Sequence, residues 1–448
     1  MLDLKYYQTI VIWGFGREGA ATFGYLKSIG FGGTLLIADA SRSNIPDDID
    51  PAAFEFLDDK DLTSAPLDWT RTLIVKTPGL SLYDPRLSDL WNRGARFTSQ
   101  TNLWFQVRDP SSHVIAITGT KGKSTTAKAL AHMLSRMGED VILAGNIGKP
   151  VLSYADKSPK YFVVELSSYQ IADLKFSPDR LIFLNLKSEH IPWHKTLQNY
   201  RRDKLRVAFI DPLVRIHANR EDKVLPYELA NAPNLKWFGG QDEFHGEGQK
   251  VFDGKQCVGE VKSLLGEHNA QNISGALSVL PELGIDPALA LATLDDFEPL
   301  PHRLQRVLEK DGYVYIDDTI ATTPEATLNA LAAFPDQDVV LILGGTDRLQ
   351  DYEMLAEALV NRPRIKRFHL ITDNGPRIEA CFAPHAELIA KTHFYPVFSE
   401  AVYEARDYLP NGGVVLLSPA APRGSEFHSL EERGLTFQRL VREKWGNA

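Results

Sequence analysis

The strongest chemical pattern in the sequence is a glycine-rich segment, GTKGKST, which spans Gly119–Thr125. It follows an apolar run, His113–Thr118, that predicts a strand, and it opens a helical pattern over Ser124–Met137. In such a turn backbone N–H groups face phosphate oxygens, and the helix N-terminus favours anions. We expect ATP to bind here, with Lys123 beside the β- and γ-phosphates. A glycine-rich turn without a ligand is the alternative, because Ile117 stands where the general phosphate-loop pattern begins with glycine.

A second glycine pattern, GFGREG over Gly14–Gly19, follows the apolar run Thr9–Trp13 and precedes Asp39 by about twenty residues. This spacing is typical of dinucleotide sites, in which the helix N-terminus holds a pyrophosphate and the acid binds a ribose. An NAD-dependent dehydrogenase is therefore one interpretation. It leaves the other glycine loop without a role, whereas a substrate linked to a nucleoside diphosphate would fit the first loop and ATP the second.

Polar residues follow two apolar runs of the central region, Tyr161–Leu166 and Arg180–Leu184. Open α/β sheets place their sites at the carboxyl ends of such strands. Glu165 could ligate Mg²⁺ there, although an acid at this spacing could equally cap the following helix. His190 comes after the second run, and by itself a single loop histidine indicates little.

Lys204 lies in YRRDKLRV, among Arg201, Arg202 and Arg206. One interpretation is a solvated basic helix face. In the other, the neighbouring cations lower the pKa of the lysine. Its neutral amine could then react with carbon dioxide and become a metal-binding carbamate. The spacing alone leaves both interpretations open.

Alternating apolar runs and helical patterns predict an α/β protein with parallel sheets. Residues 108–112 (RDPSS) and the prolines at 299 and 301 favour linkers. We therefore expect three domains, at residues 1–108, 109–299 and 300–448. Further strands are expected at Thr34–Ala38 in the first domain, and at Val314–Ile316, Val339–Leu343, Arg367–Ile371 and Gly413–Leu417 in the third.

Composition excludes several classes. The net charge of −9 over 448 residues argues against a dedicated nucleic-acid binder. Two cysteines cannot form a disulfide framework, and the N-terminus lacks the features of a secretion signal. No apolar stretch approaches the roughly 20 residues that cross a bilayer. We expect a cytoplasmic monomer without membrane or nucleic-acid partners.

A series of segments over nearly the whole chain resembles the Mur ligases of peptidoglycan synthesis. In order they are GTKGKST, AGNIGKP (Ala144–Pro150), VVELSSYQ (Val163–Gln170), NLKSEH ending at His190, YRRDKLR with Lys204, GEHNAQN with Asn269 and Asn272, LPHRLQ with His302 and Arg303, and LSPAAPRGSEFHSLEERG (Leu417–Gly434). The resemblance implies a Rossmann-like N-terminal domain, a P-loop-type central ATPase domain and an α/β C-terminal domain. The implied reaction is ATP-dependent joining of an amino acid to a UDP-linked acid through an acyl phosphate.

The resemblance also implies residue roles. Lys123, Glu165, His190 and Lys204 would be catalytic. Ser124, Thr125, Glu165, His190 and carbamylated Lys204 would hold two Mg²⁺ or Mn²⁺ ions. ATP would contact Gly119, Thr120, Lys121, Gly122, Lys123, Ser124, Thr125, Asn269, Asn272, Arg303 and Asp318. UDP and its sugar would contact Gly14, Phe15, Gly16, Arg17, Asp39, Ser41, Arg42, Pro78, Gly79, Asn146 and Ser167. The amino acid would contact Ile320, Thr322, Arg423 and Ser425.

The amino-acid side departs from the family pattern. In the branch that adds glutamate to UDP-N-acetylmuramoyl-L-alanine, a segment usually reads Asp-Ser-Lys-Ala-Thr. Here residues 318–322 read DTIAT, so Ile320 replaces the lysine, while Arg423 replaces a serine that contacts the amino acid. A cation lost on one wall and gained on another suggests that a carboxylate has moved. We expect L-glutamate as the substrate, with D-glutamate as the alternative.

Two further alternatives remain at this point. A nucleotide-binding regulator on a decayed ligase scaffold would have lost the catalytic set, whereas Lys123, Glu165, His190 and Lys204 are all present. A ligase of the folyl-polyglutamate type would share the ATP loop and the lysine. It would be expected to lack a first domain that binds UDP.

Overall fold

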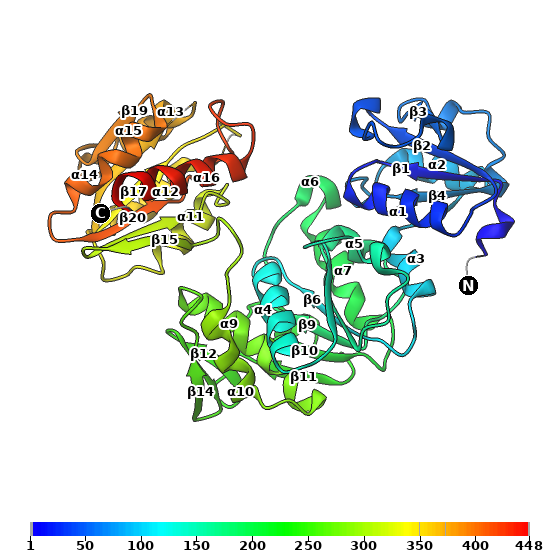
Figure 1. Ribbon diagram of the computed structural model, residues 1–448, viewed down its shortest axis with the longest axis horizontal. Helices are drawn as coiled ribbons and strands as arrows, with labels where there is room; N and C mark the ends of the chain where they lie inside the picture. Colours follow the sequence, from blue (N-terminus) through cyan, green and yellow to red (C-terminus); the bar gives the residue numbers. More distant parts are fainter. Residues whose placement is uncertain (1–2, 349, 372, 447–448) are drawn as a thin grey trace. The chain divides into compact units, whose positions relative to one another are not determined.

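Three larger sheets, each packed against helices, and one small antiparallel sheet form the framework of the protein (Figure 1). The computed structural model describes residues 3–348, 350–371 and 373–446. Within them, no helix is both long and apolar enough to cross a membrane.

The N-terminal sheet is parallel and has the strand order β3-β2-β1-β4-β5. The order reverses between β1 and β4, and such a reversal opens a crevice for ligands at the carboxyl ends of the strands. The predicted strand Thr9–Trp13 has the same bounds in the structure. The elements are β1 (Thr9–Trp13), α1 (Arg17–Ser28), β2 (Thr34–Asp39), β3 (Glu55–Asp58), β4 (Thr72–Lys76), α2 (Pro85–Asn92), β5 (Arg96–Thr98) and α3 (Gln100–Val107).

The central sheet has the order β11-β10-β9-β6-β8-β7, and all its pairings are parallel. Every residue of β8 and β9 is buried, as expected for strands that helices cover on both faces. Its strands are β6 (His113–Thr118), β7 (Val141–Gly145), β8 (Tyr161–Glu165), β9 (Arg180–Phe183), β10 (Arg215–Asn219) and β11 (Leu235–Phe238). Its helices are α4 (Lys123–Arg136), α5 (Ser168–Ala172), α6 (Ile191–His194), α7 (Leu197–Leu205), α8 (Leu225–Glu228), α9 (Glu267–Leu277) and α10 (Pro287–Ala292).

A three-stranded antiparallel sheet follows the central sheet in the sequence. It consists of β12 (Phe244–Glu247), β13 (Lys250–Asp253) and β14 (Gln256–Glu260). No strand was expected in this segment.

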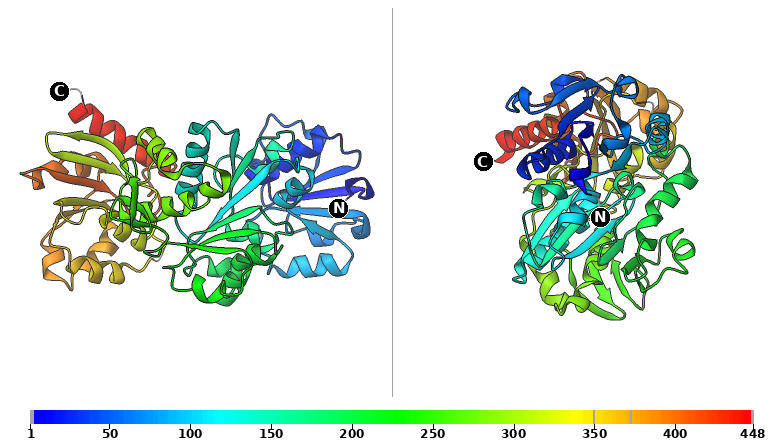
Figure 2. Two further views of the ribbon diagram at one scale, coloured as in Figure 1. Left: turned by 90° about the horizontal axis from the view of Figure 1, so that it is seen from below. Right: turned by 90° about the vertical axis from the view of Figure 1, so that its right-hand side faces the viewer.

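The C-terminal sheet has the order β15-β16-β20-β17-β18-β19, in which only the β15–β16 pairing is antiparallel. Alternate residues of its strands face two cores, one under α11–α14 and the other under α15 and α16. Figure 2 shows α16, drawn in red, from two further directions. The elements are β15 (Gln305–Lys310), β16 (Tyr313–Asp317), α11 (Pro324–Leu331), β17 (Val339–Leu343), α12 (Tyr352–Val360), β18 (Ile365–Ile371), α13 (Gly375–Phe382), α14 (Ala386–Ile389), β19 (Thr392–Tyr395), α15 (Phe398–Tyr403), β20 (Gly413–Leu417) and α16 (Leu430–Val441).

Contacts divide the chain into two compact units. The first runs to Val261 and includes Asn269–Phe297, and the second consists of Lys262–His268 and the chain from Glu298 onward. One apolar core continues from α1 and α3 into the central sheet, which explains why the first two sheets belong to one unit.

Candidate functional site

The glycine loop connects β6 to α4 in the first unit. Gly119 and Gly122 have positive φ angles of 157° and 86°, which disfavour any residue with a Cβ. A Cβ on Gly122 would also lie 2.4 Å from Oδ1 of Asn272, so α9 packs directly against the loop. Asn272 in turn donates to Oδ1 of Asn269 at 3.3 Å. The sequence motif thus forms a turn at the start of a 14-residue helix, as phosphate binding requires.

Residues that follow β9 hold the loop in shape. Asn185 accepts from the N–H of Thr120 with its carbonyl at 2.9 Å and from the N–H of Lys121 with Oδ1 at 2.8 Å. Tyr200 OH lies 2.7 Å from Oγ1 of Thr120. Nζ of Lys123 donates to the carbonyl of Thr120 at 2.9 Å. The loop is therefore positioned by segments more than sixty residues away in sequence.

Glu165 ends β8 and is fully buried beside β6. Its Oε1 accepts from Nδ2 of Asn146 at 2.6 Å, whereas Oε2 has no hydrogen-bond partner among the described residues. A buried carboxylate oxygen without a donor is costly, and a cation would satisfy it. Ser167, not Glu165, caps α5, so the interpretation of Glu165 as a helix cap is wrong.

Lys204 and His190 lie in an environment that favours their neutral forms. Lys204 is only 1% exposed, so the interpretation as a solvated residue is wrong for it. Burial, followed by the charge of Lys123, holds the pKa of Lys204 well below its usual value. Burial also lowers the pKa of His190, helped by Lys123 and Lys204 and opposed by Glu189. A neutral amine can react with carbon dioxide, and a neutral imidazole can ligate a metal.

A metal ion at these residues would need ligands other than acidic side chains. Within the described residues, no group of three or more His, Cys, Asp and Glu side chains could hold a metal. The expected set contains only two such side chains, Glu165 and His190. The other ligands would be the hydroxyls of Ser124 and Thr125 at the start of α4, and a carbamate on Lys204. The partnerless Oε2 of Glu165 is consistent with that set.

Hydrogen bonds within the chain hold the glycine-rich turn after β1, Gly14–Gly19, in its conformation. Asp39 at the end of β2 accepts from the N–H of Phe15 at 2.6 Å, the N–H of Ser41 at 3.1 Å and Nδ2 of Asn44 at 2.6 Å. Burial opposes ionisation of Asp39, but these donors outweigh it and the pKa lies below its usual value. The carboxylate therefore links the β1–α1 turn to the segment after β2.

The other expected UDP residues surround the same strand ends. Arg17 donates to the carbonyls of Gly148 at 3.1 Å and Asn146 at 3.2 Å, which ties the first sheet to the central one. The guanidinium of Arg42 lies over the rings of Phe54 and Phe56. The carbonyl of Pro78, just before Gly79, accepts from Nε1 of Trp193 at 2.9 Å, and Gly14 and Gly16 lie in the β1–α1 turn.

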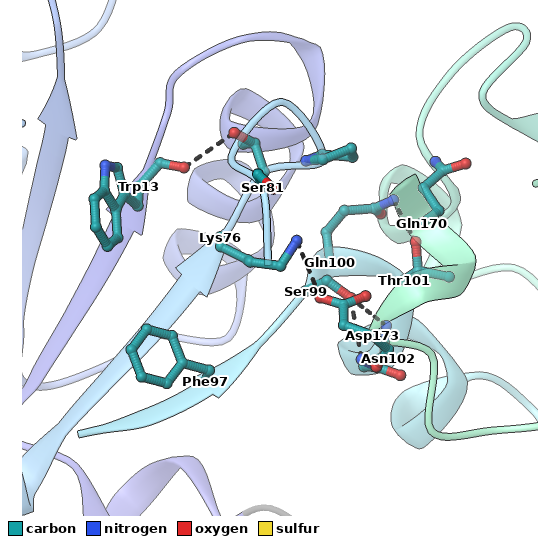
Figure 3. A network of polar contacts seen from close by, with 12 residues as sticks. Trp13, Lys76, Ser81, Phe97, Ser99, Gln100, Thr101, Asn102, Gln170 and Asp173 are labelled. Carbon is teal, nitrogen blue, oxygen red and sulfur yellow. Dashed lines mark hydrogen bonds and ion pairs between the residues drawn. The ribbon is translucent and has the colours of Figure 1, made fainter. Parts of the chain in front are cut away.

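A buried polar network connects the N-terminal and central sheets (Figure 3). Lys76, at the end of β4 and 2% exposed, forms an ion pair with Asp173 at 3.3 Å. Nδ2 of Asn102 donates to the carbonyl of Asp173, and Gln170 donates to Oε1 of Glu18 at 2.7 Å. Burial raises the pKa of Glu18 to about 7. Because Lys76 directly precedes Thr77 and Pro78, the network anchors one end of the crevice.

The expected amino-acid residues lie at the carboxyl ends of strands in the second unit. Ile320, after β16, is 40% exposed, and the carbonyl of Thr322 accepts from Nε2 of Gln350 at 3.2 Å. Arg423, after β20, is exposed and donates to the carbonyl of Phe427. Its other N–H groups have no hydrogen-bond partner within the part of the chain that the structure describes. The N–H of Ser425 donates to Asp373 at 2.9 Å.

Two residues expected at ATP, Arg303 and Asp318, also belong to the second unit. Asp318 is buried, accepts from the hydroxyl of Ser418 at 2.7 Å and from the N–H of Leu304 at 3.1 Å, and has its pKa raised to about 7 by burial. Nε of Arg303 is buried without a partner among the described residues. Asn269 and Asn272, in contrast, lie on α9 with the loop.

Comparisons with known proteins identify the family. The Mur ligase middle domain matches residues 117–280, and the Mur ligase glutamate ligase domain matches residues 302–421. A UDP-N-acetylmuramoyl-L-alanine--L-glutamate ligase of Xanthomonas euvesicatoria is 34% identical over 97% of this chain and 95% of its own length. The ligase of the same name from a Micromonospora strain is 33% identical over 98% of both chains. This chain belongs to the Mur ligase family.

Solved structures agree on the fold. The Mur ligase MurF of Thermotoga maritima, in complex with ADP, has a TM-score of 0.61 over 99% of this chain and 100% of its own, at 17% identity. MurC of the same organism has a TM-score of 0.59 over 98% of this chain. Folylpolyglutamate synthase of Mycobacterium tuberculosis covers only 77% of this chain, with a TM-score of 0.56.

The protein is therefore an ATP-dependent, amide-bond-forming Mur ligase of peptidoglycan synthesis with the three-domain α/β architecture of its family. The ligase prediction is confirmed, and the interpretation as an NAD-dependent dehydrogenase is wrong. The folyl-polyglutamate alternative is less well supported, because near-full-length likeness extends to ligases whose names specify a UDP-linked substrate.

Proposed function

We propose that this Mur ligase joins L-glutamate to UDP-N-acetylmuramoyl-L-alanine. The main support is the near-full-length identity of 34% to proteins that carry this activity in their names. The departures at Ile320 and Arg423 support it further, because an apolar side chain and a guanidinium would favour a different placement of the substrate carboxylate.

The proposed reaction has two steps. A carboxylate oxygen of the acceptor attacks the γ-phosphorus of ATP, and ADP leaves. The amino group of glutamate then attacks the acyl-phosphate carbon, phosphate leaves, and the nitrogen loses its proton. A carboxylate and a triphosphate repel each other, so Lys123 would stabilise the negative charge as it develops.

Mg²⁺ would be held by Ser124 or Thr125, Glu165, His190 and Lys204 as its carbamate. Bound at this site, Mg²⁺ would offset phosphate charge. Formation of the carbamate requires the neutral amine of Lys204, which adds to carbon dioxide and releases one proton. The partnerless Oε2 of Glu165 and the depressed pKa of Lys204 support this assignment.

We assign the remaining roles by position. Asn269 and Asn272 would contact ATP from α9 beside Gly119–Thr125, and Arg303 and Asp318 are proposed as further ATP contacts. The UDP part would lie on the β1–α1 turn, and its sugar would face Asn146 and Ser167. The residues proposed for UDP are Gly14, Phe15, Gly16, Arg17, Asp39, Ser41, Arg42, Pro78 and Gly79.

Assays with both enantiomers test the substrate. With ATP, Mg²⁺ and UDP-N-acetylmuramoyl-L-alanine, we expect L-glutamate to give ADP and a UDP-linked dipeptide, with D-glutamate turned over far more slowly. Product formation is followed by mass spectrometry, with a reaction lacking ATP as the control. Efficient turnover of D-glutamate alone would contradict the proposal.

Arg423→Ala is expected to raise the KM for L-glutamate by about tenfold to a hundredfold, because a charge-assisted bond to a carboxylate is lost. The KM values for ATP and the UDP-linked substrate should change little. Arg442→Ala, which removes an exposed arginine near the end of the chain, is the matched control. An unchanged KM for glutamate in Arg423→Ala would remove Arg423 from the pocket.

A further inference from the structure

Arg433 of α16 is a fully buried arginine with a complete set of hydrogen bonds. Nε donates to Oγ1 of Thr319 at 2.7 Å, and Nη2 donates to the carbonyls of Thr319 at 2.9 Å and Ala421 at 3.1 Å. Nη1 donates to the carbonyls of Gly344 at 3.2 Å and Pro422 at 2.9 Å. A guanidinium cation has five N–H groups, so each one has an acceptor.

The five acceptors belong to three different loops. Thr319 follows β16, Gly344 follows β17, and Ala421 and Pro422 follow β20. Two of these loops carry the residues that distinguish this ligase on its amino-acid side. Ile320 comes directly after Thr319, and Arg423 comes directly after Pro422. A single side chain thus fixes the backbone immediately before both.

Glycines allow this close approach. A Cβ on Gly345 would lie 1.8 Å from the carbonyl of Pro422 and 3.0 Å from Nη1 of Arg433. A Cβ on Gly434 would lie 2.1 Å from Nδ1 of His302. Side chains at either position would push α16 or the β17 loop away, so the glycines and Arg433 act together to seat the helix against the strand ends.

The charge of Arg433 has no direct counter-ion. Within the described residues, no carboxylate forms an ion pair with it. Asp317, whose charge acts on Arg433, accepts from His302 at 2.7 Å and from Gln438 at 2.9 Å instead. The hydrogen bond to Asp317 raises the pKa of His302. Four carbonyls and one hydroxyl oxygen therefore accept all the hydrogen bonds of the guanidinium.

We infer that Arg433 is a positioning residue for the amino-acid substrate. It holds the backbone of the loops that carry Ile320 and Arg423. The inference rests on the proposed function, because it takes the substrate to be an acidic amino acid.

Two variants test the inference. Arg433→Lys keeps the charge but offers three donors without the planar fork, and Thr319→Val removes one acceptor while keeping the shape. Both are expected to raise the KM for glutamate about tenfold or more, with the KM values for ATP and the UDP-linked substrate within about twofold of wild type. Arg439→Ala on the exposed side of the same helix is the control and should leave all three unchanged. Thermal melting identifies a variant that fails to fold, in which case the other one decides.

Three outcomes separate the inference from the proposed function. Equal rises in all three KM values, or none, would overturn the positioning role. A wild-type enzyme that uses neither enantiomer of glutamate contradicts the proposed function, and the same comparison is then made with the acidic amino acid that it does use. Use of uncharged or basic amino acids only would overturn the inference, because it takes the substrate to be acidic.

Discussion

Replacing Lys123 with alanine is expected to abolish ATP-dependent ligation, with a loss in kcat of about a thousandfold or more. The side chain is the only lysine at the start of α4, and its Nζ already lies at the loop, 2.9 Å from the carbonyl of Thr120. Without it, the helix end would lose the cation that is proposed to offset the charge of the transferred phosphoryl group. ADP release and formation of the ligated product, measured together, give the rate.

Binding of the UDP-linked substrate should survive in Lys123→Ala, because the residues proposed to hold it lie on other loops. Isothermal titration calorimetry is expected to give a dissociation constant within about threefold of wild type, less than the loss of one hydrogen bond. The control is Arg136→Ala in the last turn of the same helix, where the side chain is exposed and pairs with Asp296. Equal loss of ligation and substrate binding would mean that the two nucleotide sites have been assigned to the wrong loops.

The positions of the main strands follow from the sequence because their apolar runs are dense and bounded by glycine. His113–Thr118 and Gly413–Leu417 have the predicted bounds, and all but the first residue of each is buried. The strands β12 to β14 were not predicted. They are short, many of their residues are exposed, and Phe244–Glu260 lacks a regular alternation that would mark one buried face.

The motifs located the glycine loops but not the side chains that shape them. Asn185 and Tyr200 bind the Gly119–Thr125 loop from positions 64 and 80 residues further along the chain, and only the packing of β9 and α7 beside β6 brings them there. In the segments NLKSEH and YRRDKLR, the sequence indicates a role only for His190 and Lys204. The one indication that Asn185 belongs to a site is its position directly after a predicted strand.

The spacing of charged residues in helices does not indicate which of them are buried. In YRRDKLR the pattern could not separate Lys204, which is buried, from Arg202 and Arg206, which are exposed. Arg433 lies in a matched motif, yet nothing in its spacing indicates a buried guanidinium. Burial of a charge depends on which acceptors the rest of the fold supplies, and these come from three distant loops.

Lys204→Ala is expected to be inactive, with partial recovery of ligation when a short carboxylic acid such as acetate or propionate is added. The physical reason is that the buried amine, whose pKa burial and the charge of Lys123 lower, is proposed to become the carbamate that ligates Mg²⁺. A free carboxylate would stand in for that anion in the space that the lysine side chain vacates. Initial rates over a range of acid concentrations provide the measurement.

Arg201→Ala is the matched control for Lys204→Ala, because it removes a cation from the same helix, three residues earlier, without touching the proposed ligands. Its activity should stay near that of wild type and should not respond to the added acid. Recovery in Lys204→Ala should also saturate, since one carboxylate occupies one vacated site. Full activity of Lys204→Ala without acid would contradict a role as metal ligand, whereas inactivity that no carboxylate relieves would contradict the carbamate and favour the amine itself as the functional group.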